Sequence, residues 1–276
     1  MKLTIREQFA EVASRADEDI PLALAALLIA AEANPEIDIE DYLTRLASYA
    51  EGFRQDKRFN TEMGVPLKGL ITYIHQELGF CGNLSDYYDP NNSYLNRVID
   101  LKRGIPISLA LVHIAIGEHL NIPVSGITFP GHFLLRYGGD NGIIVDPFSG
   151  RELSRADCQN LLRQIAGARA TLKDEYFSIA SPRDILIRML DNLKQIFWRQ
   201  KDWDESEACI DRQLLLLPDR TEFNVQLGAV YEMQGNTSLA QHTYTRVLQE
   251  NPDNEQLREL ASRRLLALEQ SSKTVH

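Results

Sequence analysis

Three positions in this sequence have the order of a nucleophile, a base and a carboxylate, but the first of them is a proline. The base is His132, in FPGHF (129–133), and the carboxylate is Asp146, in IVDPF (144–148). The position where a thiol would begin a buried helix is Pro106, in RGIPISL (103–109). A complete triad of this kind transfers acyl groups, because the imidazole deprotonates the nucleophile and the carboxylate orients the imidazole. We interpret His132 and Asp146 as a remnant catalytic pair; the alternative is a structural pair in which the histidine, bonded to the carboxylate, fixes a hairpin.

Proline at the first position removes two functions together. A catalytic thiolate is stabilised by a helix N-terminus, and the backbone N–H of the nucleophile helps to bind the oxyanion. Pro106 has neither a thiol nor an N–H, so the usual route is excluded. Ser108 and Cys81 are the alternative nucleophiles. We expect Ser108, about 200° around the helix from position 106, to be a small packed residue, and Cys81 to be an incidental half-buried thiol.

The elements that would position these residues are one buried helix and a set of strands. Segment 106–120 is apolar on nearly all sides, which predicts a buried helix with its proline in the first helical position. Strand-type segments follow at 124–129, 132–137 and 142–148. A three-residue hairpin loop, Gly138 to Asp140, would set His132 directly opposite Asp146, within contact distance on one face. A loop of two or four residues would instead put them on opposite faces.

Helical patterns flank this central region. The first 80 residues predict helices at Leu22–Ala33, Ile39–Gly52 and Val65–Leu78. From about residue 182 a period of 34 residues appears, with the matched pairs Leu193 and Leu227, Phe197 and Tyr231, Ile210 and Tyr244, and Pro218 and Pro252. This spacing is that of two tetratricopeptide repeats, followed by a capping helix at 254–268. We therefore predict two domains, 1–180 and 181–276, the second leaning on the first because two repeats are few.

The first helices of the repeats are the expected binding face. They would present Arg188, Asp191, Gln195, Trp198 and Arg199 from one repeat, and Glu222, Val225, Ala229 and Glu232 from the next. An exposed tryptophan beside arginines is a suitable anchor for a peptide, so we select Trp198, Arg188, Gln195 and Arg199 as candidate binding residues. The alternative is that Trp198 packs against the first domain.

Composition narrows the possible partners. The net charge is −10 and the pI is about 5.1, without a basic patch, which argues against nucleic acid. The longest apolar run is shorter than the ~20 residues that span a bilayer, and the N-terminus is too charged for a signal peptide. Three scattered cysteines predict a reduced, cytoplasmic protein without disulfides, and no metal or cofactor motif is evident. The oligomeric state stays open.

Four motifs together resemble a known family. They are DYYDPNNSYLNRV (86–98), RGIPISL (103–109), FPGHF (129–133) and DPF (146–148). The whole chain resembles the bacterial SirB-type family, whose members join a transglutaminase-like domain to tetratricopeptide repeats. The resemblance implies an α+β, papain/transglutaminase-like core with N-terminal helices, followed by an all-α repeat module. It also implies a non-catalytic relative of transglutaminases, and the family name suggests regulation of invasion genes in an enteric pathogen.

The leading hypothesis is therefore a transglutaminase-like pseudoenzyme that binds a protein or peptide as an adaptor or regulator, of gene expression or virulence. The first alternative is a hydrolase or acyltransferase that uses His132 and Asp146 with a non-standard nucleophile. The second is a sensor that binds a small molecule in the former catalytic cleft.

Overall fold

The computed structural model describes residues 3–59, 67–250 and 254–274, with side chains described up to 270. The chain divides into two compact units, Met1–Met189 and Leu190–His276. The first combines helices with two small sheets, and the second is helical, which confirms the predicted α+β core followed by a repeat module.

The first unit begins with helices. They are α1 (Ile5–Ala13), α2 (Leu22–Ala33), α3 (Ile39–Gln55), α4 (Leu67–Thr72) and α5 (Leu95–Leu101). The first two predicted helices are confirmed, and α3 runs three residues beyond its predicted end. The third continues from α4 as one π-helical turn, Tyr73–Glu77, and its predicted positions 65 and 66 lie outside the described residues.

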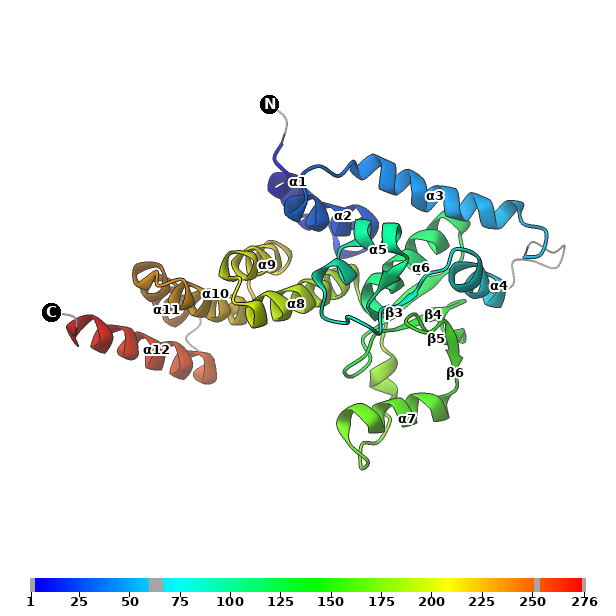
Figure 1. Cartoon of the computed structure of the whole chain (residues 1–276). Coiled ribbons are helices and arrows are strands. Elements are labelled where there is room, and N and C mark those ends of the chain that lie inside the picture. Colours follow the sequence, from blue (N-terminus) through cyan, green and yellow to red (C-terminus); the bar gives the residue numbers. More distant parts are fainter. Residues whose placement is uncertain (1–2, 60–66, 251–253, 275–276) are drawn as a thin grey trace. The chain divides into compact units, whose positions relative to one another are not determined.

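Helix α6 (Pro106–Leu120) forms the core of this unit. Its residues 106–117 are all buried, as expected of a helix without a polar face. The strands β3 (Val124–Ile127), β4 (Leu134–Tyr137), β5 (Ile143–Asp146) and β6 (Arg151–Leu153) form an antiparallel sheet in that order. Side chains of β4 alternate between α6 and α7 (Arg155–Ala166), so the two helices cover opposite faces of the sheet (Figure 1).

The hairpin register differs from the prediction. Leu135 pairs with Val145 and Tyr137 with Ile143, so the loop contains five residues, 138–142, and not three. Two successive glycines with positive φ, Gly138 and Gly139, turn the chain early and make the longer loop possible. The predicted strand at 132–137 begins only at Leu134, because residues before it form a turn.

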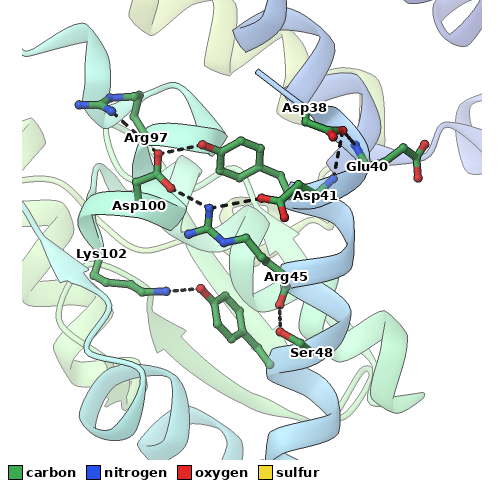
Figure 2. Close-up of polar contacts among 10 residues, drawn as sticks. Asp38, Glu40, Asp41, Arg45, Ser48, Arg97, Asp100 and Lys102 are labelled. Carbon is green, nitrogen blue, oxygen red and sulfur yellow. Dashed lines mark hydrogen bonds and ion pairs between the residues drawn. The ribbon is translucent and has the colours of Figure 1, made fainter. Parts of the chain in front are cut away.

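A polar cluster attaches α3 to α5. We define the α3–α5 latch as Tyr42, Arg45 and Asp100 (Figure 2). The Asp100 carboxylate accepts hydrogen bonds from the Tyr42 hydroxyl and from Arg45, each at 2.8 Å. Next to it, the Lys102 ammonium donates to the Tyr49 hydroxyl, and Lys102 has the left-handed conformation that ends α5 (φ 57°). The latch thus fixes the segment that leads into α6.

The second unit contains the repeats. Helix α8 (Pro182–Gln200) starts in the first unit and ends in the second, and is followed by α9 (Trp203–Leu216), α10 (Thr221–Met233), α11 (Thr237–Glu250) and α12 (Glu255–Thr274). A Cβ atom on Gly228 would lie 2.6 Å from the Tyr244 ring, so the glycine is needed for close packing of α10 on α11. The predicted capping helix is α12, and Pro252 lies outside the described residues.

Candidate functional site

His132 and Asp146 are in contact. The Nε2 atom of His132 lies 3.0 Å from Oδ1 of Asp146, and both side chains keep some exposure, 18% and 17%. The same Asp146 oxygen accepts the Phe148 backbone N–H at 3.0 Å, and its second oxygen accepts the Ser149 hydroxyl at 2.7 Å. Burial of Asp146 opposes its ionisation, but the hydrogen bonds from His132 and Ser149 outweigh it and lower the pKa. The carboxylate is therefore ionised and orients the imidazole.

A tight turn presents His132. The His132 N–H donates to the Phe129 carbonyl at 3.1 Å, with Pro130 and Gly131 at the corners and a φ of 66° at Gly131. This is the residue pattern of a type II turn. The Arg188 guanidinium donates to the carbonyl oxygen of His132 at 2.8 Å. The turn and Arg188 together fix the position of the imidazole.

A short hydrogen-bonded path connects this pair to the start of α6. Strands β1 (Cys81–Gly82) and β2 (Arg103–Gly104) are parallel, and β2 ends two residues before Pro106. The Gly82 N–H donates to the Phe148 carbonyl at 2.9 Å. A Cβ atom on Gly82 would lie 2.4 Å from the Phe148 ring, so glycine is required there. The segment after Asp146 is thus joined to the helix N-terminus.

The residues at the start of α6 pack in the core and cap the helix. Pro106 is buried in the first helical position. The Ser108 hydroxyl donates to the Asn92 carbonyl and accepts the Ile105 N–H at 3.1 Å, and Ser108 has 0% exposure. These bonds occupy the hydroxyl in capping the helix, which supports the interpretation of Ser108 as a packed residue.

The cysteines differ in exposure. Cys158 and Cys209 are buried, and burial raises the pKa of both thiols, that of Cys209 to about 12. Both are thiols at neutral pH. Cys81 is half-buried in β1, beside the strand that leads into α6. Among the three cysteines, Cys81 is therefore the candidate for a non-standard nucleophile.

A buried aromatic group lies between α6 and the sheet, and the sequence patterns did not identify it. His113 contacts the Tyr137 hydroxyl through Nδ1, and its ring centroid lies 5.0 Å from that of His75. Burial lowers the pKa of both histidines, so both are neutral. In the described part of the chain their Nε2 atoms have no hydrogen-bond partner. In the sequence, only the position of His113 on an apolar helix pointed to this buried group.

No group of three or more histidine, cysteine, aspartate or glutamate residues is arranged to hold a metal ion among the described residues. Within the same part of the chain, no helix combines the length and the apolar character that crossing a membrane requires.

The candidate binding residues of the repeat module lie in different places. Trp198 is 37% exposed and packs edge-on against Trp203, with ring centroids 5.3 Å apart. Trp198 and Gln195 line one cavity of about 390 Å³. Arg199 is exposed but is not among its lining residues, and Arg188 contacts the turn of His132. Val225, expected on the binding face, is buried among α10, α11 and α12; that expectation is wrong, because the residue packs against Ala240 and Tyr244.

The fold and the paired His132 and Asp146 define a transglutaminase-like domain joined to tetratricopeptide repeats. Residues 38–191 match the model of the transglutaminase-like superfamily, and residues 193–264 match a tetratricopeptide repeat model. The chain belongs to the UPF0162 family within this superfamily, which confirms the resemblance found in its motifs.

Relatives include a UPF0162 protein of Xylella fastidiosa (strain 9a5c), 38% identical over 241 residues, which are 86% of each chain. A UPF0162 protein of Vibrio cholerae is 28% identical over 269 residues, or 94% of this chain and 98% of the relative. F-box only protein 21 of Homo sapiens is 28% identical over 171 residues, or 57% of this chain and 26% of the relative.

Proposed function

We propose that this protein is a non-catalytic, cytoplasmic transglutaminase-like adaptor or regulator that binds a protein or peptide. The observation that carries the proposal is the buried Pro106 at the start of α6, where a nucleophile would stand. Proline supplies neither attacking sulfur nor an oxyanion-binding N–H. The oriented pair of His132 and Asp146 then acts as a hydrogen-bonding surface and not as a base.

The repeat module supports the interaction role. Tetratricopeptide arrays present extended surfaces to partners, and this one carries a partly exposed tryptophan at a cavity. We further propose that the adaptor regulates gene expression or virulence, because the family name suggests that role. The expectations that the protein binds neither nucleic acid nor membrane belong to the same proposal.

The catalytic part of the proposal is tested with reactive probes. Purified protein and the His132→Ala variant are treated with an iodoacetamide probe and a fluorophosphonate probe, and assayed with p-nitrophenyl esters and with amine incorporation into casein. We expect no turnover, and labelling of Cys81 that does not depend on His132. Site-specific labelling or turnover that is lost with His132→Ala would contradict the proposal.

The binding part needs its own experiment. Affinity purification with chemical crosslinking compares wild type with His132→Ala and Trp198→Ala, after circular dichroism has shown that all three are folded. We expect at least one partner to be lost from one variant and retained by the other. Equal recovery of every partner by all three proteins would contradict a role for both sites.

A second candidate function is favoured by one observation. Cys81 is half-buried in β1, and the partner strand of β1 leads directly into α6. The residue after Cys81, Gly82, donates its N–H to the Phe148 carbonyl. A hydrolase or acyltransferase would use Cys81 with His132 and Asp146. The geometry of Ser108 favours it less, because its hydroxyl is occupied by capping bonds. The Cys81→Ala variant in the turnover assays decides between these functions.

A further inference from the structure

The cavity beside Trp198 contains a buried ammonium group. Lys194 of α8 is 9% exposed, and its Nζ donates to Asp191 Oδ1 (2.7 Å), Gln213 Oε1 (2.8 Å) and Gln226 Oε1 (2.6 Å). The corresponding residue of the second repeat is Gly228, where a tyrosine ring fills the space. The first repeat therefore has a charged group where the second has a glycine, and its ammonium lies 5.5 Å from the centroid of the Phe223 ring.

Lys194 positions other groups and has no bond left for a ligand. An ammonium group has three N–H donors, and all three are used. Asp191 Oδ1 accepts a second bond, from Gln213 Nε2 at 2.8 Å. The hydrogen bonds described for Asp191 are at Oδ1 and that of Gln226 is at Oε1, and the Asp191 side chain is 40% exposed. The cavity therefore presents a fixed carboxylate oxygen and a fixed amide donor.

An indole ring stands beside these groups. Asp191, Gln195 and Trp198 have the i, i+4, i+7 spacing of one helix face, and all three line the cavity of about 390 Å³. Trp198 is held edge-on by Trp203 and stays 37% exposed. An indole face attracts cations, and it stacks well on a planar guanidinium group.

Charge selects the class of ligand. A carboxylate ligand would meet Asp191 and would find the Lys194 donors occupied. A cation finds the outer oxygen of the Asp191 carboxylate, whose other oxygen is paired with Lys194, and acidic residues outnumber basic ones across residues 190–276. We propose that this cavity binds an arginine side chain of a partner peptide, with its guanidinium stacked on Trp198 and bonded to Asp191, and with Gln226 donating to a peptide carbonyl. This deepens the proposed adaptor function and rests on it.

The chain contains its own reporter for this site. Its two tryptophans are Trp198 and Trp203, which are in contact, so intrinsic fluorescence reports on the cavity. The full chain is titrated with acetyl-Gly-Gly-Arg-Gly-Gly-amide and with the same peptide carrying citrulline or lysine. Citrulline keeps the planar shape and removes the charge. We expect a saturable change with the arginine peptide, and binding at least about tenfold weaker with citrulline, a factor that one lost charged contact supplies.

Variants separate the pocket from the overall charge. Asp191→Asn should weaken binding of the arginine peptide about tenfold, whereas Glu259→Gln, the same charge change at an exposed position of α12, should leave it unchanged. Trp198→Phe should weaken binding of the arginine peptide as well, and calorimetry measures this variant because it removes part of the fluorescence reporter. Lys194→Met should also weaken binding of the arginine peptide. If Lys194→Met does not fold, the comparison of Asp191→Asn with Glu259→Gln decides the test.

Three outcomes would overturn the site. They are equal binding of the arginine and citrulline peptides, no saturable binding by fluorescence or calorimetry at millimolar peptide, and equal weakening by Asp191→Asn and Glu259→Gln. The adaptor function would survive any of them if crosslinked partners are still lost with His132→Ala, so the two failures are distinguishable.

Discussion

At the residue scale, His132 and Asp146 form an oriented pair, and we propose that Pro106 stands where a nucleophile would be. Asp146 receives three hydrogen bonds, from His132, Phe148 and Ser149. These contacts would orient an imidazole for catalysis, and they also stabilise the fold around the hairpin. Under the proposed non-catalytic function, this second role accounts for the presence of the pair.

The stabilising role of Asp146 predicts a pH dependence. Its folded pKa lies below the unfolded value of about 3.9, so the ionised carboxylate stabilises the fold above that pH, and this contribution is lost as the pH falls through the folded pKa. Asp146→Asn should lower the free energy of unfolding by about 1 to 2 kcal/mol at pH 7, and the difference should shrink below about pH 4. Urea denaturation across this pH range measures it.

The control for this prediction is Asp140→Asn, at an exposed position of the β4–β5 loop. Its effect should stay within about 0.5 kcal/mol. A difference between wild type and Asp146→Asn that is constant from pH 7 to pH 3 would show that the carboxylate charge does not stabilise the fold.

The turn before β4 gives a second prediction at this scale. Gly131 has a φ of 66°, and an added Cβ would lie 2.4 Å from Ile165, whereas Gly139 has a φ of 77° and nothing within 4 Å. Gly139→Ala should therefore cost about 1 kcal/mol of unfolding free energy from backbone strain alone, and Gly131→Ala about 2 kcal/mol or more. Chemical denaturation of both variants gives the comparison. Equal losses would mean that Ile165 moves aside freely.

At the element scale, the N-terminus of α6 is specialised for stability. Pro106 fits the first helical position, and the Ser108 hydroxyl links Ile105 to the Asn92 carbonyl. The α3–α5 latch fixes the approach to the same helix, and β1 joins it to Phe148. The elements that would position a nucleophile are all present, and they hold a packed helix end.

Ser108→Ala tests this account of the helix end. Loss of the hydroxyl removes a buried cap, so we expect the free energy of unfolding to fall by about 1 to 2 kcal/mol. Ser48→Ala, at an exposed position of α3, is the matched control and should stay within about 0.5 kcal/mol. Thermal and urea unfolding measure both. Ser108→Ala with wild-type stability would reopen the case for a reactive hydroxyl.

At the scale of the whole molecule, two compact units share one helix. The first half of α8 contributes Arg188 to the His132 turn, and its second half contributes Lys194 and Trp198 to the repeat module. A single element thus carries groups for both candidate sites. Each unit keeps its own core, and the chain as a whole is acidic.

The overall charge of −10 gives a prediction about partners. Binding to nucleic acid depends on neutralising phosphates with lysine and arginine, and it is strongest at low salt. We expect no change in fluorescence anisotropy of a labelled duplex DNA or single-stranded RNA at about 50 mM salt, the low end of the usual range. A saturable change that disappears at higher salt would refute the exclusion of nucleic acid.

Patterns in the sequence were sufficient to predict much of the fold and the candidate residue pair of this protein. The apolar run of α6, the repeat spacing and the order of Pro106, His132 and Asp146 predicted the buried helix, the repeat module and the candidate pair, and the family resemblance of the motifs supplied the fold class, because periodicity and motifs can be read along the chain. The hairpin register, the clamp from Arg188 on the His132 turn and the network around Lys194 came only from the tertiary structure. They depend on contacts between residues far apart in the chain, which no local pattern records.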